Sequence, residues 1–286
     1  MKKNLLILGL VFATSALFAQ DEEIKIAEGT FMSTRIANSH SVEMTKPGRL
    51  EFKMCHRMGR LNDGPYQLFG FDQSTFRMGF DYGINDWLNA GFGRSTVQKL
   101  YDGFFKVRML RQSSGKKNFP VSMVWMSSMA INSMKWEDPT RTNYFSSRMS
   151  YVHQLIVARK ITDNFSFQLM PTVVHRNLVA TSSDKNDVIC IGAAARYKLN
   201  RTFALTAEYT YILPDQISSQ YNGNTIQNSF SAGIDIFTGK HVFQVFLTNS
   251  TGMAEKQAFT ESTESWNHGG IHIGFNIERY FTLVNK

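Results

Sequence analysis

The sequence lacks long apolar runs after its first 20 residues. A membrane-spanning helix needs about 18 or more uninterrupted apolar residues, and no later stretch approaches that length. The mean hydropathy is −0.24, which is low for a helical membrane protein. Helical periodicity is also scarce after residue 48. These absences exclude a protein that crosses a membrane by helices.

Cysteine is rare as well. The chain holds two cysteines, Cys55 and Cys190, which lie far apart in sequence. It has no Cys-x-x-Cys pair and no cluster of Cys and His, so the sequence predicts no metal site and no cofactor. We expect both cysteines to be buried as small residues. An oxidising compartment would allow a single disulfide, but the spacing does not indicate one.

Motifs for nucleotides and nucleic acids are also missing. Gly91-Phe-Gly93 lies in an expected strand and lacks the strand, turn and helix that a dinucleotide site requires. A glycine pair of this kind is typical of a strand that bends or packs closely. We therefore predict no nucleic-acid partner.

The first 20 residues form a distinct segment. They begin with Lys2 and Lys3, continue with an apolar run from Leu5 to Phe12, and end near the small residues Ala16 and Ala19. This order predicts a secretory signal peptide that is removed at about Gln20. The apolar run is too short for a membrane anchor, and no cysteine follows it for lipid attachment.

The remaining chain is basic. It carries 29 Lys and Arg against 23 Asp and Glu, because Lys2 and Lys3 of the total of 31 belong to the signal peptide. A net charge of +6 suits anionic lipid headgroups or a small anionic solute. Secretion argues against nucleic acid as the partner. The sequence identifies no partner protein.

Alternating apolar and polar residues dominate the chain after residue 48. This period of two predicts β-strands. We expect twelve of them, at 48–58, 74–84, 87–96, 101–111, 119–131, 147–159, 165–176, 187–198, 202–212, 228–237, 241–249 and 269–281.

The connections between these strands alternate between short and long. Tight turns rich in Asn, Asp and Gly occur at 84–87, 161–165, 199–203 and 237–241. Long polar loops, such as 132–145 and 250–266, fall between them. An even number of strands with short turns at one end is typical of an outer-membrane barrel, with both termini on the periplasmic side. A soluble secreted sandwich or a lipocalin-like barrel is the competing all-β fold.

The two faces of the strands help to separate these folds. Phe76, Met78 and Phe80 share one face of a strand, and Arg77 and Asp81 share the other. The expected strands have about 10–12 residues, the length that crosses a bilayer at a tilt, whereas ordinary strands have about 5–6. Aromatic residues gather near the strand ends, as in interfacial girdles. We therefore predict an all-β fold, a transmembrane antiparallel up-and-down β-barrel of about twelve strands, in contact with outer-membrane lipid.

The sequence divides into three parts. These are a signal peptide (1–20), an N-terminal periplasmic or lumen-plug segment (21–47) and the outer-membrane β-barrel (48–286). Within the second part, 31–40 mixes apolar residues with Ser, Thr, Asn and Arg. This composition fits either a loose periplasmic leader or a plug inside a polar lumen.

A series of motifs resembles a known family. They are Cys55-His-Arg-Met-Gly59, Gly64, Phe69-Gly-Phe-Asp72, Arg77-Met-Gly79, Asp81-Tyr-Gly83, Gly91-Phe-Gly-Arg94, Lys99-Leu-Tyr-Asp102 and Lys106. Together they resemble an uncharacterised Bacteroidetes-type outer-membrane β-barrel family, a domain of unknown function. The resemblance is dense over 50–112 and weaker to the C-terminus. Family members more often have Phe at Met58 and Leu at Phe71. The resemblance implies a signal peptide and an outer-membrane barrel, and no established activity.

The inward face of the expected barrel carries charge. The candidate lumen-lining residues, which would form a pore lining or an ion-pair network, are Arg77, Asp81, Lys106, Arg108, Arg196, Glu208, Asp235 and Glu278. Basic groups outnumber acidic ones slightly when Glu51, Lys53 and Lys198 are added. Two interpretations stay open: a passive channel that favours small anions, and a closed barrel, braced by ion pairs, with a structural or partner-docking role.

A rim motif lies where the first barrel strand meets its outer loop. It comprises His56, Arg57 and Gly59. Arg57 would either bind an anionic group or donate hydrogen bonds to loop carbonyls or to Asp72. His56 is better explained as a hydrogen-bonded rim residue than as a ligand or base, because no positioned carboxylate is evident.

A catalytic Ser–His pair is not found on any one strand face. Ser150 and His153 are three residues apart, which places them on opposite faces of a strand. Lipid hydrolases are also barrels of this size, but their chemistry needs a nucleophile, a base and an orienting group. We therefore do not expect an enzyme.

Overall fold

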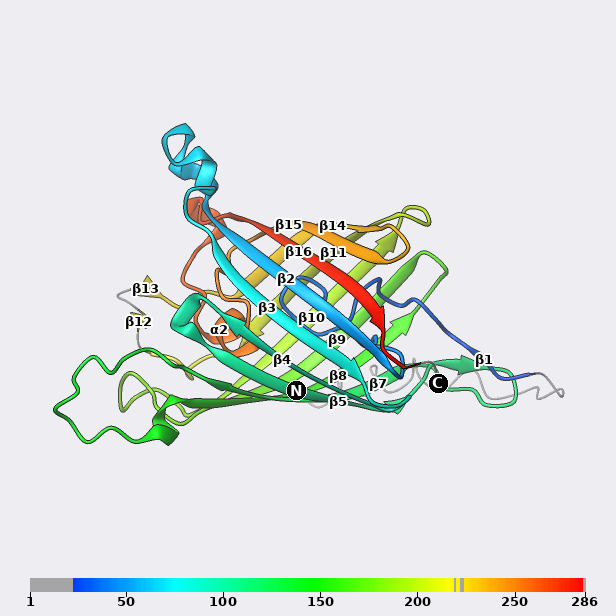
Figure 1. Cartoon of the computed structure of the whole chain (residues 1–286), viewed down its shortest axis with the longest axis horizontal. Helices are drawn as coiled ribbons and strands as arrows, with labels where there is room; N and C mark the ends of the chain where they lie inside the picture. Colours follow the sequence, from blue (N-terminus) through cyan, green and yellow to red (C-terminus); the bar gives the residue numbers. More distant parts are fainter. Residues whose placement is uncertain (1–22, 219, 222–223, 285–286) are drawn as a thin grey trace, which may run out of the picture.

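The computed structural model describes residues 23–218, 220–221 and 224–284. The signal peptide predicted at 1–20 lies outside them. Twelve antiparallel strands close into a barrel, as Figure 1 shows. They are β2 (Arg49–Arg60), β3 (Thr75–Gly83), β4 (Leu88–Ser95), β5 (Tyr101–Leu110), β7 (Ser122–Ile131), β8 (Met149–Lys160), β9 (Phe165–Arg176), β10 (Asp187–Lys198), β11 (Phe203–Ile212), β14 (Ser229–Phe237), β15 (His241–Thr248) and β16 (His272–Thr282).

The barrel confirms the fold predicted from the sequence. Each strand pairs with its neighbour in the chain, and β16 pairs with β2 to close the ring. Both ends of every barrel strand lie within three residues of the expected ends. The alternation is reliable because adjacent residues of a strand must point to opposite faces of a closed sheet.

Short turns and long loops occupy opposite ends of the barrel. The turns after β3, β8, β10 and β14 gather toward the right of Figure 1, and the long loops gather toward the left. The connections at the long-loop end carry short 3-10 helices, η1 (Leu61–Asp63), η2 (Pro65–Gly70), η3 (Val97–Lys99, in the short link after β4), η4 (Phe145–Arg148) and η5 (Trp266–His268), and the short strands β12 (Gln220–Tyr221) and β13 (Asn224–Thr225). At the short-turn end, β1 (Lys25–Ile26) pairs with β6 (Ser113–Ser114).

The outer surface of the barrel is apolar. Large side chains that are at least one third exposed lie on every second residue of many strands. Examples are Met78, Phe92, Phe105, Trp125, Leu169, Ile191, Leu205 and Val245. A continuous apolar belt of this kind is favourable only in contact with lipid hydrocarbon. The backbone N–H and C=O groups need no water there, because neighbouring strands of the closed barrel hydrogen-bond to each other. Among the described helices, none has the length and hydropathy needed to span a membrane.

The inner surface has two different parts. The polar wall consists of the inward faces of β11, β14, β15, β16, β2, β3 and β4, where buried residues such as Glu51, Lys53, Asp81 and Glu208 are charged. The apolar wall consists of the inward faces of β5 and β7–β10. Its buried side chains include Phe104, Val124, Met126, Val152, Ile156, Met170, Val174, Val188 and Cys190.

Two segments fill the space inside the barrel. The inserted segment, defined here as residues 30–45, enters from the short-turn end, where Figure 1 shows it in blue behind β2 and β3. The inward helix α2 (Glu255–Thr260) belongs to the long loop after β15 and enters from the other end. Because both are buried, the barrel has a core of its own inside the strands.

Candidate functional site

The contact between the inserted segment and the barrel wall is the candidate functional site. Nearly every residue from Thr30 to Val42 is buried. Two backbone–backbone hydrogen bonds lie within the segment: Ile36 donates to the carbonyl of Ser39 at 2.9 Å, and Ser41 donates to that of Thr34 at 3.0 Å. Side chains of the segment itself bind further backbone groups, such as Arg35 N–H to Ser33 Oγ at 2.9 Å. Buried backbone groups need partners, and side chains of the wall supply many of the others.

A carboxylate of β11 binds the tip of the inserted segment. The oxygens of Glu208 accept hydrogen bonds from the backbone N–H groups of Ala37 (3.4 Å), Asn38 (2.8 Å) and Ser39 (3.1 Å). Consecutive N–H groups that converge in this way form a concave site for an anion. Glu208 therefore fixes the tip of the segment through backbone contacts that do not depend on side-chain identity.

Three cations of the wall bind carbonyl groups of the N-terminal region. Arg57 donates to the carbonyl of Ala37 at 3.1 Å, and Lys106 donates to that of Ser41 at 2.8 Å. Arg196 donates to the carbonyl of Gly29 at 2.6 Å. Together with Glu208, these groups hold the segment from three sides of the barrel.

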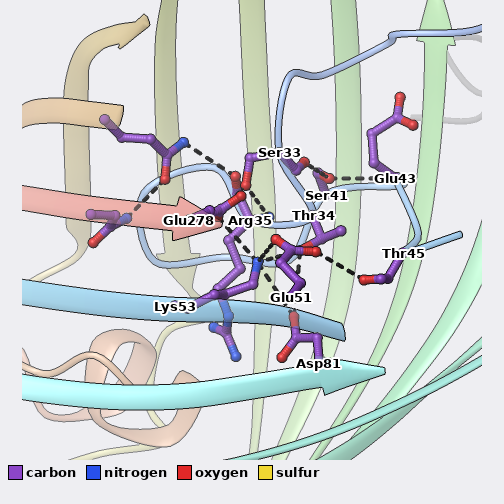
Figure 2. A network of polar contacts seen from close by, with 12 residues as sticks. Ser33, Thr34, Arg35, Ser41, Glu43, Thr45, Glu51, Lys53, Asp81 and Glu278 are labelled. Atoms are coloured by element: carbon purple, nitrogen blue, oxygen red, sulfur yellow. Dashed lines mark hydrogen bonds and ion pairs between the residues drawn. The ribbon is translucent and has the colours of Figure 1, made fainter. Parts of the chain in front are cut away.

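Figure 2 shows the ion-pair cluster of the polar wall beside the segment. Lys53 Nζ lies 2.9 Å from Glu51, 3.3 Å from Asp81 and 3.1 Å from Glu278. Hydroxyl groups of the segment complete the cluster, since Thr34 donates to Glu51 at 3.1 Å and Thr45 donates to it at 2.9 Å. Buried charges are tolerated only when paired and hydrogen-bonded in this way.

The apolar side chains of the segment face the apolar wall. Phe31, Ile36 and Val42 belong to the same buried cluster as the wall residues, and Phe259 of α2 joins them. Gln168 of β9 adds a two-point contact with the backbone: its Oε1 accepts from Val42 N–H at 2.8 Å, and its Nε2 donates to the His40 carbonyl at 2.9 Å. The segment is therefore matched to both walls.

The inserted segment and α2 meet inside the barrel. Glu255 of α2 lies 2.8 Å from Arg35 Nη1 and 3.0 Å from His40 Nε2. All three side chains are at most 3 % exposed. Burial, assisted by the Arg35 charge, lowers the pKa of His40 from 6.5 to about 3. This contact links a segment tied to one end of the barrel with a loop tied to the other.

Most of the predicted lumen residues point inward and are buried. They are Arg77, Asp81, Lys106, Arg196, Glu208, Asp235 and Glu278. Arg77 Nε donates to Asp102 at 2.9 Å, and Asp235 accepts from Gln244 at 3.1 Å and from Thr206 at 3.3 Å. Arg108 is different, since it lies at the short-turn end and donates to the Asp86 carbonyl at 2.6 Å.

The predicted surplus of inward basic groups is not present among the described barrel strands. Their buried basic residues are Lys53, Arg57, Arg77, Lys106, Arg176 and Arg196, and their buried acidic residues are Glu51, Asp81, Asp102, Glu208, Asp235 and Glu278. The two sets are equal in number. The count from the sequence had included Lys198 and Arg108, which are only half-buried, and had left out the buried residues Arg57, Arg176 and Asp102.

The three residues of the rim motif have different positions. Arg57 is buried and binds the inserted segment and Asn276 (3.0 Å), where the sequence had suggested Asp72 as a partner. His56 faces outward, with its ring 4.9 Å from that of Phe76. Gly59 lies against Gly70, which has a φ of +89° and whose added Cβ would come within 2.4 Å of Gly59.

A serine and a histidine do meet on the outer face, but across two strands. Ser127 of β7 lies opposite His153 of β8, with Oγ 3.0 Å from Nδ1. The sequence search had considered single strands only and missed this pair. His153 also stacks on Trp125 at 5.9 Å. Among the described residues, we find no acidic or amide side chain hydrogen-bonded to His153, so the orienting group of a catalytic triad is missing.

Several residues of the site were not identified from the sequence. Asp102 has the inward phase of Lys106, four residues later, so the alternation could have revealed it. Arg35, His40 and Glu255 lie outside the strands, where no local pattern assigns an inward direction. The two cysteines are free and buried.

Comparisons with known proteins agree with this fold. The family model described as "Membrane bound beta barrel domain (DUF5777)" matches residues 31–281. No curated protein matches the chain significantly.

Among solved structures, the NanC porin is 9 % identical, with a TM-score of 0.48, over 82 % of this chain and 100 % of that one. The KdgM porin is 9 % identical, with a TM-score of 0.46, over 82 % and 99 %. Omp33 of Acinetobacter baumannii is 8 % identical, with a TM-score of 0.44, over 82 % and 98 %. These likenesses are too weak to transfer a function. The family match covers most of the chain, including all but the first residue of the inserted segment. The chain therefore belongs to this family of membrane-bound β-barrels.

Proposed function

We propose that the protein is a porin-like channel of the outer membrane that its own inserted segment holds closed. Residues 30–45 act as a plug, and small solutes cross only when the plug leaves the lumen. The observation that carries this proposal is the burial of the segment, with wall side chains bonded to its backbone. A Bacteroidetes origin remains an expectation from the resemblance.

The bonding pattern favours a plug that can move. The segment contains no helix or strand, and its internal hydrogen bonds are those of a short turn and of its own side chains, so it can leave as an extended chain. The polar-wall groups it would leave behind, such as Glu208, Arg57 and Lys53, are charged, and water can solvate them in an open lumen. These features are what a removable plug on the polar wall requires.

An opened lumen would have weak charge selectivity. The described wall buries six basic and six acidic side chains. A preference for anions, which the positive net charge of the chain had suggested, needs a surplus of fixed positive charge along the path. We therefore expect small solutes of either sign to pass at similar rates.

A permanently closed barrel with a structural or docking role is the second candidate. The apolar wall favours it, because withdrawal of the segment would expose Phe31, Ile36 and Val42 together with the wall side chains they cover. Burial of each such side chain contributes about 1.5–3 kcal/mol. The closed state is accordingly the resting state under either proposal.

Conductance in planar bilayers separates the two. The mature chain is compared with a variant lacking residues 23–46, which removes the segment and keeps β2 intact. The plug proposal expects rare openings of the mature chain and a steady current from the deletion variant. A control deletion of 135–143, an exposed part of a long loop, should conduct as the mature chain does. A folded deletion variant that stays silent at all voltages would favour the closed scaffold.

A further inference from the structure

The loop between β2 and β3, residues 61–74, exposes four large apolar side chains. Tyr66 is 91 % exposed, Leu68 is 56 % exposed, and Phe69 and Phe71 are each 49 % exposed. We call these four side chains the apolar knob. Large apolar side chains that gather on a protein surface mark contact with a membrane or with another protein.

The backbone of this loop is ordered and strained. Phe69 donates to the carbonyl of Gly64 at 2.8 Å, and Phe71 donates to that of Leu68 at 3.1 Å. Leu68 and Phe69 have φ values of +46° and +54°, in the left-handed region that bulky side chains rarely adopt. Gly70 is the only buried residue of the loop. Strain of this kind persists where the surrounding structure enforces it, often at binding sites, and here it holds the knob outward.

The loop projects sideways from the barrel. Arg57 of β2 pairs with Thr75, the first residue of β3, and β2 continues to Arg60 without a partner on that side. Because β2 is tilted, this extension carries the loop past the barrel wall. Figure 1 shows the loop in light blue at the upper left, clear of the wall at the long-loop end. Lipid of the leaflet at that end surrounds the wall there.

The knob continues the lipid-facing surface of β3. Met78 belongs to the apolar belt, and Phe76, two residues nearer the loop, has the same outward phase. This row leads to the end of β3 at Thr75, next to the loop. An apolar surface that continues a lipid-facing belt is stabilised by contact with hydrocarbon, whereas exposure of the same surface to water is unfavourable.

The charge of the loop indicates which part of the membrane it contacts. Residues 61–74 contain Asp63 and Asp72 and no Lys, Arg or His. Attraction to anionic headgroups needs basic residues near the membrane surface. The knob therefore suits the acyl chains and not the phosphate groups of the lipid, and its contact should not depend on salt.

The loop between β7 and β8, residues 132–148, offers a comparison. It also exposes aromatic side chains, Tyr144 and Phe145, but it carries charges of both signs, such as Lys135 and Glu137. Figure 1 shows this loop in green at the lower left, extending away from the end of the barrel. We expect its aromatic side chains to face water.

We propose that the apolar knob inserts into the acyl region of the surrounding membrane leaflet and anchors the long-loop end of the barrel there. The occupant of this surface is lipid, and the contact is apolar. The anchor goes beyond the channel proposal and does not depend on movement of the inserted segment. It extends lipid contact from the strands of the belt to a loop.

The test uses a nitroxide spin label on a single introduced cysteine, in a Cys55→Ala/Cys190→Ala background reconstituted in phosphatidylcholine vesicles. Electron paramagnetic resonance measures collisions of the label with oxygen, which concentrates in hydrocarbon, and with a water-soluble nickel chelate. The label at Tyr66→Cys should collide with nickel at least about threefold less often than the label at Tyr144→Cys, and more often with oxygen. High salt should leave this difference unchanged, because the contact is apolar.

A second pair of variants shows whether the knob or the label itself causes insertion. Leu68→Asn/Phe69→Asn removes two apolar side chains, and Asn tolerates the left-handed backbone. In this background, nickel collisions of the label at position 66 should rise at least about twofold. Met134→Asn/Phe145→Asn makes the same change at two exposed residues of the other loop and should leave these collisions unchanged.

Three results would contradict the membrane anchor. They are equal nickel collisions at the two labelled positions, equal effects of the two double variants, and spin–spin broadening at Tyr66→Cys with exclusion of both reagents. The last result would mean that the knob contacts a second copy of the chain instead of lipid.

Discussion

The polar and apolar walls of the lumen hold the same segment by different means. The polar wall binds backbone groups and hydroxyls of the segment through charged side chains such as Glu208, Arg57 and Lys53. The apolar wall covers Phe31, Ile36 and Val42. Water can replace the first kind of contact but not the second. The polar wall alone would suit an open pore, and the apolar wall explains why the resting barrel is filled.

The largest effect is expected from the ion-pair cluster of the polar wall. Lys53→Met leaves Glu51, Asp81 and Glu278 buried without their shared cation. Breaking a buried ion pair in this way costs about 3–5 kcal/mol. Urea unfolding followed by tryptophan fluorescence should show this loss, whereas Lys198→Met at the half-buried short-turn end of β10 should change stability by less than about 1 kcal/mol. Equal effects would mean that the cluster is hydrated.

Stability should fall when a side chain packed on the apolar wall is made smaller. Ile36→Ala removes methyl groups from a side chain that is 2 % exposed and belongs to the inner cluster. The expected loss is about 2–5 kcal/mol, because a cavity is left inside the barrel. Ile191→Ala on the lipid-facing side of β10 provides the control, since lipid can fill the space. An Ile36→Ala protein as stable as the parent would show that the segment does not pack on the apolar wall.

The two cysteines allow the same chemical change on each wall. Cys190 is fully buried within the apolar cluster, whereas Cys55 points inward next to Lys53 and Arg57 on β2. Cys190→Ser should destabilise the protein by about 1–3 kcal/mol, because the hydroxyl lacks a partner. Cys55→Ser should cost less than about 1 kcal/mol, since polar groups surround it. A reversed order in urea unfolding would contradict the division into two walls.

Acid should weaken the contact between the inserted segment and α2. The pKa of His40 is lowered to about 3, mainly by burial and then by Arg35, so the folded protein keeps the ring neutral while the unfolded chain takes up a proton below about pH 6.5. Stability therefore falls as the pH drops from about 6.5 toward 3.

The lowered pKa of Glu255 adds a loss of stability at lower pH. Burial raises it, but the charge of Arg35 and the hydrogen bond with His40 outweigh this and hold it well below 4.5. The ionised Glu255 carboxylate therefore stabilises the folded protein above pH 4.5, and this stabilisation is lost as the pH falls further below 4.5. Urea midpoints measured at pH 7.5 and 5.0 should differ more for the parent chain than for His40→Gln. An equal difference would show that His40 is not buried as a neutral ring.

The sequence was sufficient to predict the barrel but not the packing of the segments that fill it. Strand ends and lipid-facing residues follow from alternation, which is a local property. The apolar wall was less evident, although β7 carries a signal: Val124 and Met126 point inward while Met123 and Trp125 point outward. In a membrane barrel, a strand that is apolar on both faces indicates that apolar side chains are packed inside the barrel. The partners of Arg57 and Glu208 depend on how the segment folds back into the lumen, and no local pattern specifies that.

The most direct test of the account is a reversible lock on the inserted segment. Asn38 of the segment and Ser231 of β14 are in contact, with Nδ2 3.0 Å from Oγ, so an Asn38→Cys/Ser231→Cys pair in a Cys55→Ala/Cys190→Ala background would tie the plug to the wall. A Ser231→Cys/Thr248→Cys pair is the control, because it joins two wall strands at a 2.9 Å contact and leaves the plug free. Single-channel recordings should show no openings of the locked chain until a reductant is added, and openings of the control in either state. Openings of equal frequency in the locked and reduced chains would contradict the claim that this segment closes the barrel.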